Sequence, residues 1–301
     1  MANIGVRSPY FIYEAEVSGT PVSAKMTLTI GGSNTYYIVK DTGDSFLVDI
    51  SEIVRDYVTP SYDGTMSSSD PGSVSVSTSV QFYDAANAGG STVGTPHTQS
   101  HTAYDAYGYY EDGNNFSITG VPLTGTTIWA PENTAGSYFS AVGTVTSYST
   151  SDTTSGSITI ERFPCSKYTP VKIVFINKYG VPQELWFFVK HVESTSSQRS
   201  TYKSSAITVS GSYTATDHQT KTLSTQGKVK YTLNTGFVAE DYNEFMRELL
   251  LSEQVWMVYD GSTRPVLLTS SDVQFKTSLN DKMVQYTIEV EQANDLISSM
   301  R

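Results

Sequence analysis

Two histidines four residues apart, His97 and His101, are the first side chains whose type and spacing could bind a metal ion. Imidazoles at this spacing act together when a helix carries both on one face. Here they lie in a polar segment without helical periodicity, which we expect to be a loop, and no cysteine or obvious carboxylate completes a ligand set. We therefore predict no metal site, and nothing else in the sequence indicates a cofactor.

Residues 104–115 form a second candidate, because four tyrosines there are interleaved with acidic and turn-forming residues. The tyrosines are Tyr104, Tyr107, Tyr109 and Tyr110, and the acids are Asp105, Glu111 and Asp112. Aromatic faces beside carboxylates can stack on a sugar ring and hold its hydroxyl groups, so the tyrosines are a candidate platform for a host glycan. The alternative is a hairpin whose Glu-Asp-Gly-Asn turn supplies positive φ angles while the rings pack inside the protein.

The sequence motifs of common enzyme classes do not occur in this chain. It contains no Gly-x-Ser-x-Gly, no glycine-rich phosphate loop ahead of a helix and no His-Glu-x-x-His. Among its 30 acidic residues, no pair stands out as the two carboxylates of a glycoside hydrolase. We therefore predict that the protein is not an enzyme.

Charge and composition argue against further classes of function. The net charge is −11 and no run of Lys and Arg occurs, which argues against nucleic acid as a partner. No apolar stretch approaches the roughly 20 residues that cross a bilayer, so no membrane partner is expected. Cys165 is the only cysteine, which rules out an intrachain disulfide. The first residues lack the features of a signal peptide, so we expect synthesis in a cytoplasm.

Alternation of apolar and polar residues dominates the sequence and is typical of β-strands. Apolar side chains occupy every second position of residues 23–30, and Gly31-Gly32 then predicts a turn into residues 36–40. Further strands are expected at residues 74–82, 142–148 and 157–162. Short strands joined by Ser- and Gly-rich turns predict a mainly β fold with two β-sandwich-like domains. A change in composition places their boundary near residue 163, giving domains over 1–162 and 163–301.

One or two short helices are expected beside these strands. The first should begin at Asp49, in an Asp-x-x-Glu start, and end before Pro60. The second covers residues 241–251 and also begins with an Asp-x-x-Glu pattern. Its apolar stripe consists of Tyr242, Phe245, Met246, Leu249 and Leu250, and its opposite face carries Glu240, Asn243, Arg247 and Glu248. We expect the stripe to pack on the C-terminal strands, with a contact between subunits as the alternative.

Residues 171–176 and 184–189 should pair as an antiparallel hairpin near the middle of a sheet, since both are rich in aromatic and β-branched residues. Asn177 and Gly180 tolerate the positive φ angles of a tight connection, which Pro182 ends. Trp186 and Phe187 must point to opposite faces of the sheet. The polar residues 194–225 that follow are either a long hairpin arm, which reaches a neighbouring subunit, or a mobile loop.

The pattern of this hairpin, a strand ending in Asn177-Lys-Tyr-Gly180 and a strand carrying Trp186-Phe187, resembles a block of tailed-bacteriophage virion proteins. Residues 6–57 and 242–291 resemble the same class of proteins, the latter being similar to tail and baseplate proteins in which a helix precedes the strands of a ring-forming domain. Residues 59–160 resemble nothing known to us.

The resemblance implies a structural subunit of a phage particle, located in the virion after synthesis in the host cytoplasm. Its place would be a ring of the tail, the baseplate or the head-to-tail collar, and its partners other copies of itself and other virion proteins. The alternative that the resemblance leaves open is a carbohydrate-binding adhesin of the tail tip, with the four tyrosines as its platform.

Overall fold

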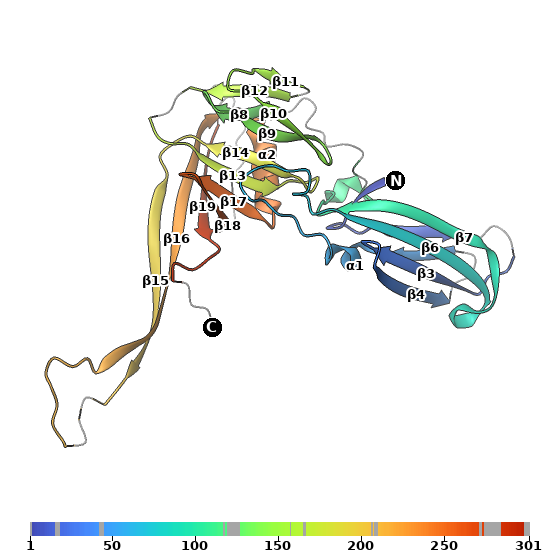
Figure 1. The fold of residues 1–301 in the computed structure, drawn as a ribbon, viewed down its shortest axis with the longest axis horizontal. Coiled ribbons are helices and arrows are strands. Elements are labelled where there is room, and N and C mark those ends of the chain that lie inside the picture. Colours follow the sequence, from blue (N-terminus) through green and yellow to red (C-terminus); the bar gives the residue numbers. More distant parts are fainter. Residues whose placement is uncertain are drawn as a thin grey trace.

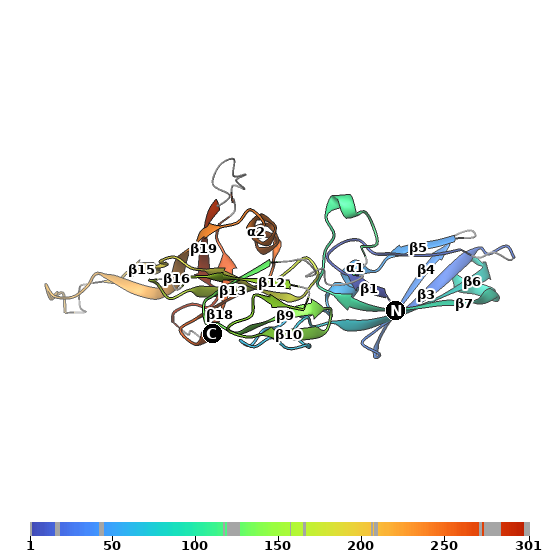
Figure 2. The same ribbon diagram turned by 90° about the horizontal axis from the view of Figure 1, so that it is seen from above.

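The computed structural model describes residues 2–15, 19–41, 45–116, 118, 127–156, 158–164, 167–205, 207, 210–270, 273 and 284–297. Strands make up most of this part of the chain, with two short α-helices, so the expected mainly β fold with sandwich-like packing is confirmed. The molecule is elongated: the N-terminal strands lie at one end, and a long hairpin projects from the other (Figures 1 and 2).

The N-terminal part is a five-stranded sheet covered by a two-stranded ribbon. The sheet has the order β1 (Ala2–Gly5), β7 (Gly89–Tyr104), β6 (Val74–Ala85), β3 (Ser23–Ile30) and β4 (Asn34–Asp41). The ribbon pairs β2 (Phe11–Ala15) with β5 (Ser45–Asp49), and a 3₁₀ turn η1 (Ala86–Ala88) joins β6 to β7. The alternating residues of β3 point into the core between the two layers, as expected. Gly31 and Gly32 make the predicted turn with φ of 62° and 75°.

Helix α1 (Ser51–Arg55) is shorter than expected, and its start differs from the prediction. Ile50 occupies the N-cap position, and no side chain caps the helix. The Asp49 carboxylate instead accepts hydrogen bonds from the backbone N–H groups of Tyr10 and Ser51, at 3.1 and 2.9 Å, and so ties the ribbon to the helix. The prediction that Asp49 begins and caps the helix is therefore wrong.

The middle of the chain forms two small sheets that pack against the C-terminal sheet. They contain β8 (Thr127–Pro131), β9 (Gly136–Ala141), β10 (Thr144–Tyr148), β11 (Thr154–Ser155) and β12 (Ile158–Phe163). Tyr148 and Ile160 share one hydrophobic cluster with Val174 and Val181. This cluster crosses the boundary expected near residue 163, and the division into domains 1–162 and 163–301 stays a prediction.

The C-terminal part is a seven-stranded antiparallel sheet. Its order is β14 (Pro182–Phe187), β13 (Val171–Ile176), β17 (Val255–Tyr259), β18 (Ser262–Leu268), β19 (Val284–Gln292), β16 (Thr220–Val238) and β15 (Val192–Lys203). Strands β13 and β14 pair as predicted, with Val171 opposite Phe187. The expectation that this hairpin lies near the middle of the sheet is wrong for β14, which is an edge strand. Its residues are nevertheless buried, because β8 and β9 cover it, and an edge also tolerates Pro182 at the start of the strand.

In the connection between β13 and β14, only one of the two residues expected to tolerate a positive φ adopts one. Gly180 has a φ of 74°, whereas Asn177 does not adopt a positive φ. The Asn177 side chain stabilises the turn differently: its Oδ1 accepts hydrogen bonds from the backbone N–H groups of Tyr179 and Val181, at 3.0 and 3.2 Å.

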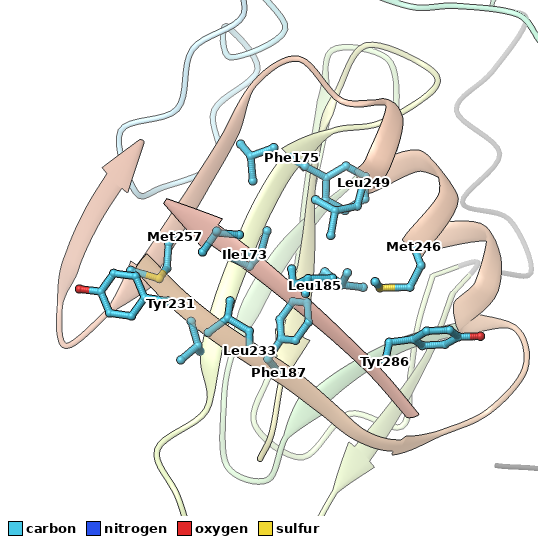
Figure 3. Close-up of a cluster of buried hydrophobic side chains, with 14 of the residues drawn as sticks. Ile173, Phe175, Leu185, Phe187, Tyr231, Leu233, Met246, Leu249, Met257 and Tyr286 are labelled. Carbon is cyan, nitrogen blue, oxygen red and sulfur yellow. The ribbon is translucent and has the colours of Figure 1, made fainter. Parts of the chain in front are cut away.

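Helix α2 (Tyr242–Leu251) packs on its own sheet, as expected. Tyr242, Met246 and Leu249 lie in the main core with residues of β13, β14, β17 and β19 (Figure 3). Asp241 stands at the N-cap position but its side chain makes no capping hydrogen bond, so that part of the prediction is wrong. The helix closes one face of the curved sheet, while β8 to β12 cover strands on the other.

Strands β15 and β16 extend beyond the body of the sheet as a hairpin arm (Figure 1). All residues of β15 are exposed, and so are those at the start of β16. Of the two sequence interpretations of residues 194–225, the hairpin arm is therefore the one observed in the described residues. Its contact with a neighbouring subunit stays a prediction.

Candidate functional site

The four tyrosines of the candidate platform do not form one exposed surface. Tyr104 and Tyr107 are buried, Tyr109 is half-buried, and Tyr110 is 99% exposed. The interpretation of this segment as a hairpin is also wrong: after β7 the chain forms a loop with a 3₁₀ turn, η2 (Tyr110–Asp112). Packing explains the first two tyrosines, while the last two remain available to a ligand.

Tyr109 and Tyr110 line an open pocket of about 620 Å³. The other lining residues are Ser8, Pro9, Gly108, Gly113 and Asn114. Two chain segments separated by about a hundred residues thus build one hollow, which no local pattern in the sequence could have indicated. The volume falls within the range of about 300–1,000 Å³ that is usual for small-molecule sites.

Behind the pocket, the loop that carries these tyrosines contacts the tip of the β13–β14 hairpin. Lys178 Nζ lies 2.7 Å from the Asp112 carboxylate and 4.2 Å from the centre of the Tyr109 ring. The Tyr107 backbone N–H donates to the Lys178 carbonyl oxygen at 3.0 Å. A Cβ atom on Gly180 would lie 3.0 Å from the backbone of Asp105. Glycine is therefore required here for two reasons, the close approach of the two backbones and the positive φ of the turn.

Two carboxylates of α2 complete this junction. Glu244 accepts a hydrogen bond from the Tyr109 hydroxyl at 2.9 Å. Glu248 was expected on the solvent face of the helix but is buried, because the hairpin tip covers that face. Burial raises the pKa of Glu248 from 4.5 to about 7, and the neighbouring Glu244 adds to the increase while Lys178 opposes it. The buried acid therefore titrates near neutral pH.

We expect Glu248→Gln to stabilise the protein above pH 7. A raised pKa means that the folded state holds the proton more tightly, so the contribution of Glu248 is favourable below pH 4.5 and is lost as the pH rises through 7. At pH 8 the amide should therefore raise the free energy of unfolding by up to about 3 kcal/mol, and the gain should shrink towards pH 5. Urea unfolding at both pH values measures it. The exposed Glu240→Gln is the control, and an equal pH-dependent gain there would contradict the prediction.

Cationic side chains connect the two halves beside this junction. Arg7 donates to the Leu251 carbonyl oxygen at 2.9 Å and lies 3.3 Å from the Glu253 carboxylate, which Arg55 also contacts at 2.6 Å. Asp105 is buried close by, and burial raises the pKa of its carboxyl while Arg7 opposes the increase. The joint between the N-terminal and C-terminal parts is therefore polar and rich in ionic contacts.

The two histidines lie on strand β7 and not in a loop, because alternate residues of this polar segment point into the N-terminal sandwich. His97 Nδ1 lies 2.9 Å from Glu14 Oε2, and His101 Nε2 lies 3.1 Å from Gln99 Oε1. Gln99 donates to the same Glu14 carboxylate. Burial lowers the pKa of His101, so the ring is neutral at pH 7. The arrangement is a hydrogen-bonded chain inside the sandwich, in which Glu14 is the residue that sequence reasoning missed.

Within the described residues, no group of three or more His, Cys, Asp or Glu side chains that could hold a metal ion occurs. Neither helix there has the length and hydropathy to span a membrane. Cys165 lies outside the described residues.

No protein-family model matches this chain, and neither the curated proteins nor the solved structures contain a match to it.

Proposed function

We propose that the protein is a structural subunit of a tailed-phage particle, one that forms a ring in the tail, the baseplate or the head-to-tail collar. The resemblance of its three sequence blocks to virion proteins supports this proposal. The observation that carries it is the hairpin arm formed by β15 and the exposed start of β16, which projects from the body and whose side chains lie in neither the main core nor the N-terminal core (Figure 1).

The arm exposes apolar side chains that remain in contact with water in the isolated chain. Tyr202 and Leu223 are 45% and 69% exposed, and Ile207 and Tyr213 near the tip are exposed as well. Leu223 stands at an irregularity in the pairing, where Thr222 and Ser224 have partners on β15. A two-stranded hairpin has little stability of its own in water, so burial of these side chains against another chain would order it.

The charge of the arm also suits another copy of this chain as the partner. Residues 194–225 carry three bases and one acid, whereas the whole chain has a net charge of −11. A basic arm is attracted to the acidic body of a neighbour, which favours the correct docking over arm-to-arm contact.

The arm and the N-terminal sandwich lie at opposite ends of the molecule (Figures 1 and 2). An arm at one end and a different surface at the other permit a head-to-tail contact, the type of interface that closes into a ring. Permanent interfaces of this kind bury on the order of 2,000 Å² or more.

Sedimentation velocity tests the role of the arm. The wild-type protein should form an oligomer at high concentration, and Tyr202→Ser/Leu223→Ser should sediment as a monomer with an unchanged fold. The matched control is Phe237→Ser/Leu267→Ser, which removes two exposed apolar side chains from the body of the same sheet. Assembly that survives the arm substitutions, or that is lost equally in the control, would contradict a specific role of the arm.

A further inference from the structure

The pocket beside Tyr110 has features of a binding site that assembly through the arm does not require. Tyr110 is almost entirely exposed at its rim, although a large aromatic side chain normally buries most of its ring. The Asn114 side chain is exposed and has no hydrogen bond within the described residues, so its amide donor and acceptor are both available. An unused aromatic face and an unused amide thus occur side by side.

The walls of the pocket are fixed by hydrogen bonds between the two segments that build it. Ser8 Oγ accepts from the Gly108 N–H at 2.8 Å. The Asn115 N–H donates to the Pro9 carbonyl oxygen at 3.2 Å, and the Asn115 side chain pairs with both backbone groups of Phe11. A site held in shape before binding loses less entropy when a ligand enters.

Tyr109 is held from the other side. Its hydroxyl donates to Glu244, its ring lies under Lys178, and its N–H donates to Asp112 at 2.7 Å. Because these contacts fix the ring, Tyr109 forms a wall of defined position, whereas the ring of Tyr110 is exposed to solvent at the rim. Gly113, with a φ of 74°, allows the tight bend between Tyr110 and Asn114.

The charges around the pocket select the class of ligand. None of the lining residues is charged. Lys178, which lies against the Tyr109 ring, is already paired with Asp112, and Arg7, next to Ser8 in the chain, is paired with Glu253. The exposed Glu111 next to Tyr110 would repel an anion. A neutral sugar ring matches these features. It has an apolar face that can stack on an aromatic ring, hydroxyl groups that can hydrogen-bond to an amide, and no charge.

We propose that this pocket binds a neutral sugar ring, with Tyr110 stacking on its apolar face and the Asn114 side chain contacting its hydroxyl groups. Of the four predicted tyrosines, Tyr109 and Tyr110 line this site, Tyr107 packs edge-on against Tyr109 with ring centres 5.9 Å apart, and Tyr104 lies in a separate small cluster with Ala106 and Ile118. The inference does not depend on the assembly role, because the isolated chain contains every residue of the pocket.

Saturation-transfer difference NMR on the isolated protein tests the proposal. The probes are the methyl glycosides of glucose, galactose, mannose, rhamnose and N-acetylglucosamine, with N-acetylneuraminic acid as the anionic comparison. At least one neutral glycoside should show saturable transfer, and Tyr110→Ala should raise its Kd by about tenfold or more. Asn114→Ala should weaken the same signal.

The control variant is Tyr213→Ala, which removes another highly exposed tyrosine, on the arm. It should bind the glycoside as the wild type does. The absence of transfer from every neutral glycoside would overturn the proposal. So would binding of the anionic sugar alone, or an equal loss of binding in Tyr110→Ala and Tyr213→Ala.

Discussion

Phe187→Ala is expected to lower the free energy of unfolding by about 3–5 kcal/mol, the usual cost of removing a buried aromatic ring. The side chain of Phe187 is fully buried, and its ring lies between Leu185 and Leu233 in the main core (Figure 3). The surrounding strands belong to one sheet and cannot collapse into the cavity without losing their pairing. Urea unfolding at neutral pH measures the loss.

The control for this prediction is Phe237→Ala, the same substitution on β16 of the same sheet. Phe237 is 63% exposed, so its removal should change the free energy of unfolding by about 0.5 kcal/mol or less. Comparable losses for the two variants would show that Phe187 does not lie in the core that the structure describes.

Lys172→Met should also destabilise the protein by about 3–5 kcal/mol at pH 8, because it leaves a buried carboxylate without its partner. Lys172 Nζ lies 2.7 Å from Glu184 Oε1, and the two side chains are only 15% and 5% exposed. Burial raises the pKa of Glu184 and Lys172 opposes this increase, so loss of the lysine should raise the pKa further. Since the carboxyl group can then take up a proton, the destabilisation should be smaller at pH 5.

Two further variants isolate this effect. Lys172→Met/Glu184→Gln removes both charges and should recover much of the lost stability. Arg247→Met breaks the solvent-exposed pair with Glu244 on α2 and should cost about 1 kcal/mol or less. If the double variant were as unstable as Lys172→Met, the loss would come from packing of the lysine stem, and the argument from charge would be wrong.

The periodicity of apolar residues correctly predicted the elements whose buried side chains repeat at a fixed spacing. Alternation identified the β3–β4 hairpin, and the stripe of Tyr242, Met246 and Leu249 placed α2 on its own sheet. In these segments the pattern of burial follows directly from the period of the backbone. The β13–β14 hairpin was predicted instead from its aromatic and β-branched residues on either side of a tight turn, and the two strands pair as expected.

The burial predictions failed where segments distant in the sequence decide burial. The sequence places Glu248 on the polar face of the helix, but the side chain is buried because the hairpin tip around Lys178 covers it. The central place expected for β14 was wrong because β8 and β9 bury an edge strand as completely as neighbouring strands would.

The polar segment around His97 does alternate, but its alternate residues are His and Gln and not apolar residues. Periodicity of polar side chains was the available signal for this strand, and a search for apolar residues alone overlooks it. For the pocket, the sequence predicted the tyrosines but not Ser8 and Pro9, which come from another segment of the chain.

Quantification of this protein in purified phage particles is the most direct test of the proposal that it is a structural subunit. Mass spectrometry with isotope-labelled standards should find the chain at a fixed copy number per particle, unchanged between preparations and retained after washing at high salt. Absence from the particles, or a variable trace amount that washing removes, would contradict the proposal that it is a structural component of the virion.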